Sequence, residues 1–89
     1  MSEETAIYVG KKHPMKYATA LLMQLSESKT VAVKARGRLI KNAVDVVEMA
    51  KRLNKNLKIE NIKIGSEERY DEATGTVRHV SFIEIKVEA

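Results

Sequence analysis

The apolar residues of this chain change their spacing from one stretch to the next, and this alternation limits the fold strongly. In residues 15–26 and 40–53, apolar side chains recur every three to four positions, which predicts two amphipathic helices. The recurring residues are Ala18, Leu21, Leu22 and Leu25 in the first stretch and Ile40, Ala43, Val44, Val47 and Ala50 in the second. Around them lie short stretches that are rich in β-branched residues or alternate apolar with polar side chains, which is typical of strands. These stretches are residues 5–9, 30–35, 59–64 and 82–87.

The resulting element order, β-α-β-α-β-β, predicts the fold class. A strand–helix–strand unit favours a right-handed crossover, so the first two strands should be parallel neighbours. Two helices can then cover one face of a four-stranded mixed sheet, which is a two-layer α/β (α+β) sandwich. Met15, Met23 and Met49 stand at helical spacing, and we expect them in the core rather than at a cofactor. The 89 residues suffice for a single domain, in which we expect residues 1–4 to be flexible.

Residues 65–81, which separate the last two strands, contain too few apolar side chains to pack against a core. They include a turn signal at Asp71–Gly75. We therefore expect them to form the outer half of a long hairpin that projects from the body as an arm. The apolar pattern of the preceding strand changes phase around Asn61, which indicates a bulge there.

The basic residues are concentrated in one part of the chain. The net charge is only +4, but residues 10–41 contain eight basic residues and one acid, Glu27, and so carry +7. Such segregation points to a polyanionic partner. The absence of cysteine excludes disulfides, thiol nucleophiles and thiolate-bound zinc, and two histidines alone do not make a metal site, so we expect no cofactor. No apolar run approaches the roughly 18 residues needed to cross a membrane, and we expect a soluble, cytoplasmic protein without membrane contact.

Two basic loops are the main candidate site. The first, Gly10–His13, joins a strand to a helix and carries Lys11 and Lys12, whose flexible side chains suit phosphate contacts that do not read bases. The second, Lys34–Arg38, runs from the second strand into the second helix, whose N-terminus favours an anion. In this element order both loops should lie near one end of the sheet. Their coincidence is more specific than either loop alone.

Each loop also has a plainer interpretation. Lys11 and Lys12 could belong to an ordinary solvated loop, and the second loop could be a basic turn whose charges pair with acids elsewhere. The absence of an acid among residues 34–38 argues against such internal ion pairs. Gly37 would allow close backbone approach to a ligand, and the planar guanidinium groups of Arg36 and Arg38 match phosphate geometry.

The projecting hairpin is a third candidate, because Arg69, Arg78 and His79 could reach along a backbone or into a groove. Its acids argue for a hairpin with self-compensating charge instead; they are Glu67, Glu68, Asp71 and Glu72. These adjacent acids lack the apolar pocket that catalysis would require, so we do not expect an enzyme. The aromatic residues do not form the stacking pair of an RNA recognition motif; they are Tyr8, Tyr17, Tyr70 and Phe82.

Several strings together resemble the Alba family of archaeal chromatin proteins, from about Ala6 to Val87. They are Gly10-Lys11-Lys12 with Met15 and Tyr17 after it, Lys34-Ala35-Arg36-Gly37-Arg38, Ala43-Val44-Asp45, and Ser81 followed by Ile83-Glu84-Ile85. The resemblance implies a homodimer, or a heterodimer with a second homologue, that binds duplex DNA with its basic faces and its hairpin arms. It also implies that Lys11 or Lys12 can be acetylated, which would lower DNA affinity and would bring in a deacetylase as a further partner.

The leading hypothesis is thus a non-catalytic, nucleoid-associated protein that grips double-stranded DNA with little regard to sequence. The expected contacts are Lys11, Lys12, Lys16, Lys34, Arg36, Gly37, Arg38, Lys41, Arg69, Arg78 and His79. Three alternatives stay open: a protein that mainly binds RNA, for transcript stabilisation or in a ribonucleoprotein; an enzyme acting on nucleic acid or phosphate esters; and a pure protein-interaction module. Phosphate contacts alone do not separate DNA from RNA.

Overall fold

A computed structural model describes residues 5–89, and the expectation for residues 1–4 lies outside this range. The order of elements is the expected one, with a short 3-10 turn inserted before the second helix. The elements are β1 (Ala6–Tyr8), α1 (Pro14–Leu25), β2 (Thr30–Arg36), η1 (Gly37–Leu39), α2 (Ile40–Leu53), β3 (Lys58–Asp71) and β4 (Thr76–Glu88).

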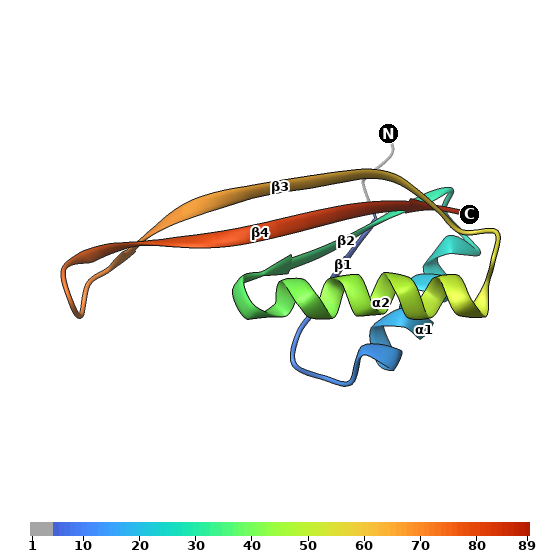
Figure 1. Cartoon of the computed structure of the whole chain (residues 1–89), viewed down its shortest axis with the longest axis horizontal. Helices are drawn as coiled ribbons and strands as arrows, with labels where there is room; N and C mark the ends of the chain where they lie inside the picture. Colours follow the sequence, from blue (N-terminus) through green and yellow to red (C-terminus); the bar gives the residue numbers. More distant parts are fainter. Residues whose placement is uncertain (1–4) are drawn as a thin grey trace.

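The four strands form one mixed sheet in the order β1-β2-β4-β3. β1 runs parallel to β2, whereas β4 is antiparallel to both of its neighbours, β2 and β3. Both helices lie on one face of this sheet (Figure 1). The predicted two-layer α/β sandwich and the parallel first pair of strands are therefore confirmed.

The core lies between the helices and the two central strands. Alternate residues of β2 and β4 point toward the helices and are buried, as the period of a strand requires. They are Val31, Val33 and Ala35 in β2 and Ile83, Ile85 and Val87 in β4. The helices contribute Ala18, Leu21 and Leu25 from α1 and Ala43, Val46, Val47 and Ala50 from α2.

Two of the three methionines expected in the core are not there. Met15 is 42% exposed and Met23 is 67% exposed, whereas Met49 packs partly buried against the core. Met23 comes five positions after the buried Ala18, and at about 100° per residue this places it on the solvent side of α1. Val44, which the repeat assigned to the apolar side of α2, is 43% exposed because it stands at the margin of the buried stripe.

The hairpin is formed by β3 and β4, which pair from Lys58–Glu88 to Asp71–Thr76. The only shift in this register falls between Ile59 and Asn61, so the predicted bulge is confirmed. β2 ends opposite Phe82, and within residues 5–89 the strand partners of residues 66–81 therefore all lie in this same segment. This part of the hairpin extends past the ends of both helices (Figure 1).

Within residues 5–89, neither helix has the length and apolarity that a membrane span requires.

Candidate nucleic-acid interface

The loop between β1 and α1 is fixed by residues other than its lysines. His13 caps α1, because its Nδ1 accepts a hydrogen bond from the Met15 backbone N–H at 3.1 Å, and Pro14 occupies the first turn. The Lys12 backbone N–H points at the Tyr17 hydroxyl oxygen, 3.4 Å away. The side chains of Lys11 and Lys12 are exposed and pair with no carboxylate of residues 5–89. The backbone is held in place while two cations remain available to a ligand.

The junction between β2 and α2 turns sharply at Gly37. Its φ of +57° lies in the left-handed region, where a side chain would be strained. Arg36 on one side is still extended, and Arg38 on the other side already belongs to η1. Arg38 is exposed and forms no ion pair with residues 5–89. Lys41, one turn further, is 2.8 Å from Asp45 on the same helix.

Both basic loops lie at one end of the sheet, as the sequence predicts. Because β1 and β2 are parallel, their carboxyl ends coincide, and the Val9 backbone N–H donates to the Lys34 carbonyl oxygen at 2.9 Å. The arm projects from the same end, since β4 residues before Phe82 continue past the last residue of β2. Lys16, exposed in the first turn of α1, also lies at this end. Two loops and an arm thus meet along one side of the molecule.

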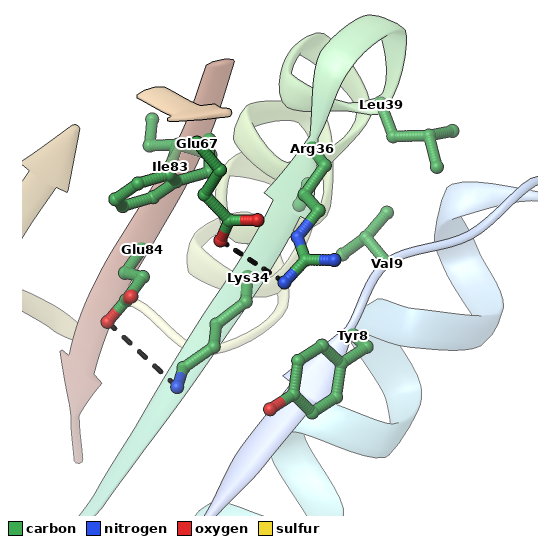
Figure 2. A pocket seen from close by; sticks show the side chains of 10 residues that line it. Tyr8, Val9, Lys34, Arg36, Leu39, Glu67, Ile83 and Glu84 are labelled. Carbon is green, nitrogen blue, oxygen red and sulfur yellow. Dashed lines mark hydrogen bonds and ion pairs between the residues drawn. The ribbon is translucent and has the colours of Figure 1, made fainter. Parts of the chain in front are cut away.

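For Lys34 and Arg36 the plainer interpretation applies in part, because their charges do pair with acids elsewhere in the sequence. The Arg36 Nη2 lies 3.2 Å from Glu67 Oε1, and the Lys34 Nζ lies 3.9 Å from Glu84 Oε1 (Figure 2). The acids come from β3 and β4, and the antiparallel register brings them beside β2 although they are far away in the sequence. Lys34 Nζ also stands 5.8 Å from the ring centroid of Tyr8, within cation–π range.

The Arg36–Glu67 pair is weak enough for a ligand to replace it. The side chains of Arg36 and Glu67 keep 52% and 38% of their accessible surface, and exposed pairs contribute only about 0–1 kcal/mol. A phosphate group that offers two oxygens to the guanidinium can compete with Glu67. Of the three predicted cationic contacts in the second loop, Arg38 is therefore available at once, whereas Arg36 and Lys34 must first leave a carboxylate.

The candidate residues of the arm do not all share a face. Arg69 and Arg78 lie directly opposite each other in the ladder, on the face of the sheet that also carries Lys34 and Arg36. His79 pairs with Glu68 and therefore points to the other face. Two arginines directly opposite each other repel, and an anion between them would relieve this repulsion. The arm thus has one cationic pair, on the same face as the ion-paired cations of β2.

Sequence reasoning missed Glu67, Glu84, Tyr8 and Phe82 as neighbours of the second loop. These residues line one cavity with Lys34 and Arg36. The alternation within the last two strands held part of the signal, because it places Glu84 on the face opposite Ile83 and Ile85. The distances of Glu67 and Glu84 from the second loop, however, depend on the strand register, which the sequence pattern alone does not determine.

The family model for Alba matches residues 5–66. The DNA/RNA-binding protein Alba of Nanoarchaeum equitans is 44% identical over 84 residues, which cover 91% of this chain and 93% of that protein. DNA/RNA-binding protein Alba 1 of Archaeoglobus fulgidus is also 44% identical over 84 residues, and the match covers 92% of each chain. These names state nucleic-acid binding and no enzymatic activity.

Solved structures agree with the sequence matches. Alba from Thermoplasma volcanium superposes with a TM-score of 0.85 at 33% identity, covering 96% of this chain and all of that one. ALBA1 from Trypanosoma brucei shares the fold, with a TM-score of 0.77 at 23% identity, over 99% of this chain and 71% of that one. The extent of the family match, the identity to the archaeal proteins and the shared architecture lead to one conclusion: the chain belongs to the Alba family.

Proposed function

We propose that this protein binds double-stranded DNA without sequence preference, as an architectural, nucleoid-associated protein. The observation that carries the proposal is the convergence of both basic loops and the arm at one end of the sheet. The cations there are long side chains on exposed loops and on the hairpin, which suits contact with phosphates rather than with base edges. Relatives named as DNA/RNA-binding proteins support the same class of partner.

The functional unit in this proposal is a dimer. Ile59, Ile62 and Ile64 lie on the helix-covered face of β3, opposite buried residues of β4, yet they are 39%, 53% and 76% exposed. β3 is an edge strand, and an exposed apolar edge promotes pairing with another chain. A second copy, related by a twofold axis, would cover these side chains and would double the number of basic loops and arms. A second homologue of similar apolar character could take the same place.

A salt series tests backbone-driven binding. The affinity for a labelled random-sequence duplex of about 40 base pairs would be measured by fluorescence anisotropy, and each neutralised phosphate should contribute about −0.9 to the slope of log K against log salt. Replacement of both Arg36 and Arg38 by Ala should weaken binding to unrelated duplexes by one common factor and should flatten the slope. A loss confined to one sequence would refute the sequence-independent mechanism.

Acetylation of Lys11 or Lys12 is a second element of the proposal. Both side chains are exposed on a loop whose backbone conformation does not depend on their charge. Acetylation would remove a phosphate contact and would leave the loop intact, so a deacetylase could restore binding.

RNA is the second candidate partner. The names of the relatives include RNA, and the cavity beside Arg36 is lined by aromatic side chains, which a duplex backbone would not use. Competition between duplex DNA and a structured RNA of equal length would rank the two partners. A strong preference for RNA would make transcript stabilisation or ribonucleoprotein assembly the main function.

A further inference from the structure

The cavity beside Arg36 lies on the face of the sheet that the helices leave uncovered. Tyr8, Lys34 and Glu84 stand in register across β1, β2 and β4, and their strand neighbours on the opposite face are core residues. The volume of the cavity is about 310 Å³, at the lower end of the roughly 300–1,000 Å³ typical of small-molecule sites. Figure 2 shows Tyr8 at one side of it and Glu67 with Arg36 at the other.

The cavity exists because two aromatic rings stand apart. The ring of Phe82 leans over Gly65 of β3, so closely that a Cβ atom on Gly65 would lie 2.5 Å from the Phe82 Cζ. Tyr8 stands on β1 at the opposite edge of the sheet and is 70% exposed. Between them the floor is formed by β2, whose Arg36 pairs in register with Phe82. A flat ligand can therefore lie on the sheet between two aromatic walls.

We infer that this cavity binds one unpaired nucleotide of a single strand, with a preference for guanine. The inference rests on the proposed nucleic-acid binding and deepens it. The exposed Tyr8 ring offers a stacking platform for a base once the Lys34 ammonium, 5.8 Å from the ring centroid, moves aside. Such stacking requires that the base be free of its complement. A base inside a duplex cannot reach the ring.

One carboxylate of the cavity, that of Glu67, selects the base. The Glu67 Oε1 accepts from Arg36, and its second oxygen forms no hydrogen bond within residues 5–89. Guanine carries two adjacent N–H donors on its Watson–Crick edge, which a carboxylate can accept together. Arg36 can keep its contact with Glu67 while the base binds, and it then holds the carboxylate in place.

The same carboxylate disfavours a duplex. A phosphate backbone presents acceptors only, so Glu67 repels it, and Arg36 must leave Glu67 before it can reach a phosphate. Glu67 should therefore act with opposite sign on the two kinds of ligand: it strengthens the binding of a single strand that contains guanine and weakens the binding of duplex DNA.

The test compares Glu67→Gln with Glu68→Gln, because Glu68 has the same charge but points to the other face of the hairpin. Labelled probes for anisotropy would be a single strand without guanine, the same strand with one guanine, and a 40-base-pair duplex; the strands would be made as RNA and as DNA. Glu67→Gln should raise duplex affinity about two- to fivefold, from the loss of an exposed ion pair. It should also abolish the preference for the strand with guanine. Glu68→Gln should preserve that preference.

A second variant separates the cavity from the duplex site. Tyr8→Leu removes the stacking ring from an exposed position and should lower single-strand affinity about tenfold, without changing duplex affinity. Equal binding of both strands together with no effect of Tyr8→Leu would overturn the cavity proposal, and intact duplex binding would leave the proposed function standing. If the wild-type protein bound none of the probes, both the proposed function and the cavity proposal would be refuted. If one guanine raises affinity more in the RNA strand than in the DNA strand, the cavity also contacts the 2′-hydroxyl group. If the increase in affinity is equal in both strands, the base is the recognised group.

Discussion

At the scale of single residues, the surroundings of a side chain decide whether its charge is available. Lys12 and Arg38 face solvent without a carboxylate of residues 5–89 beside them, whereas Arg36 is held by Glu67. All three have the same sign and lie at the same end of the sheet. A count of basic residues would treat them alike, but only the structure separates the cations that bind at once from the one that must exchange partners.

Gly65 offers a prediction at this scale. A Cβ atom there would meet three ring atoms of Phe82, the nearest at 2.5 Å, so Gly65→Ala must displace the ring. We expect a loss of about 1–3 kcal/mol in the free energy of unfolding, which is typical of overpacking, as measured by chemical denaturation.

The matched control is a double-mutant cycle with Phe82→Leu. If the ring is the cause, the double variant should lose less than the sum of the two single losses, by about 1 kcal/mol. Additive losses would mean that the Ala side chain acts through the backbone of β3 instead.

At the scale of elements, β3 has two different halves. Its first half carries exposed isoleucines on the sheet face that also bears the helices, and its second half belongs to the arm, where residues 66–81 find strand partners only among themselves within the described part of the chain. The first half supports association with a second copy, and the second half supports contact with a ligand. One strand thus connects the proposed dimer surface to the proposed binding surface.

Ile64→Glu tests the dimer surface. Ile64 is 76% exposed in the single chain, so a charge there should leave the fold intact but should disrupt an apolar interface. We expect a monomer by light scattering coupled to size-exclusion chromatography, with unchanged far-ultraviolet circular dichroism and weaker duplex binding.

Met23→Glu is the control, because Met23 is 67% exposed on α1 and the charge change is identical. It should leave the mass unchanged. If both variants keep the mass of the wild-type protein, β3 does not form the interface.

The elements themselves could be predicted from the sequence, and the contacts between them only in part. The 3.6-residue period of both helices and the alternation in β4 show which side chains of one element are buried, and each period is specific to one type of element. The phase change at Asn61 likewise marks the bulge that β3 contains. The basic loops could also be placed at one end of the sheet, because parallel strands end together.

The Arg36–Glu67 pair could not be predicted in this way. It joins residues 31 positions apart through β4, which lies between their strands in the sheet, so it depends on two strand registers at once. The exposure of Met15 and Met23 was not predicted for a related reason. Methionine is an apolar residue, but α1 buries only one narrow stripe of its surface, and the position of this stripe depends on how the helix is rotated against the sheet.

At the scale of the whole molecule, the location of charge matters more than its amount. The net charge is +4, and acids and bases are both abundant, yet the cations without carboxylate partners in residues 5–89 include the two lysines of the first loop and Arg38 at the end of the sheet from which the arm projects. Because both basic loops and the arm lie together there, we expect a polyanion to approach this side first.

Lys12→Gln, which mimics acetylation, tests this placement against Lys55→Gln. Lys55 is an exposed lysine in the connection between α2 and β3, and both variants reduce the net charge from +4 by one. We expect Lys12→Gln to lower duplex affinity about five- to tenfold and to flatten the salt slope by roughly one contact, and Lys55→Gln to do neither.

Equal losses in the two variants would mean that net charge alone governs binding. In that case neither acetylation at Lys12 nor the loop geometry would have the proposed role.

The self-paired part of the hairpin has a consequence for how such a molecule can vary. No third strand of the described chain lies beside residues 66–81, so their hydrogen bonds can open and exchange their amide protons while the core stays closed. For the same reason, insertion or deletion of a pair of residues, one in each strand, would change the length of the arm by about 3.4 Å and would leave every core contact in place. Because the length of the arm can change in such steps, related chains can differ in how far the arm extends while the core of the domain stays the same.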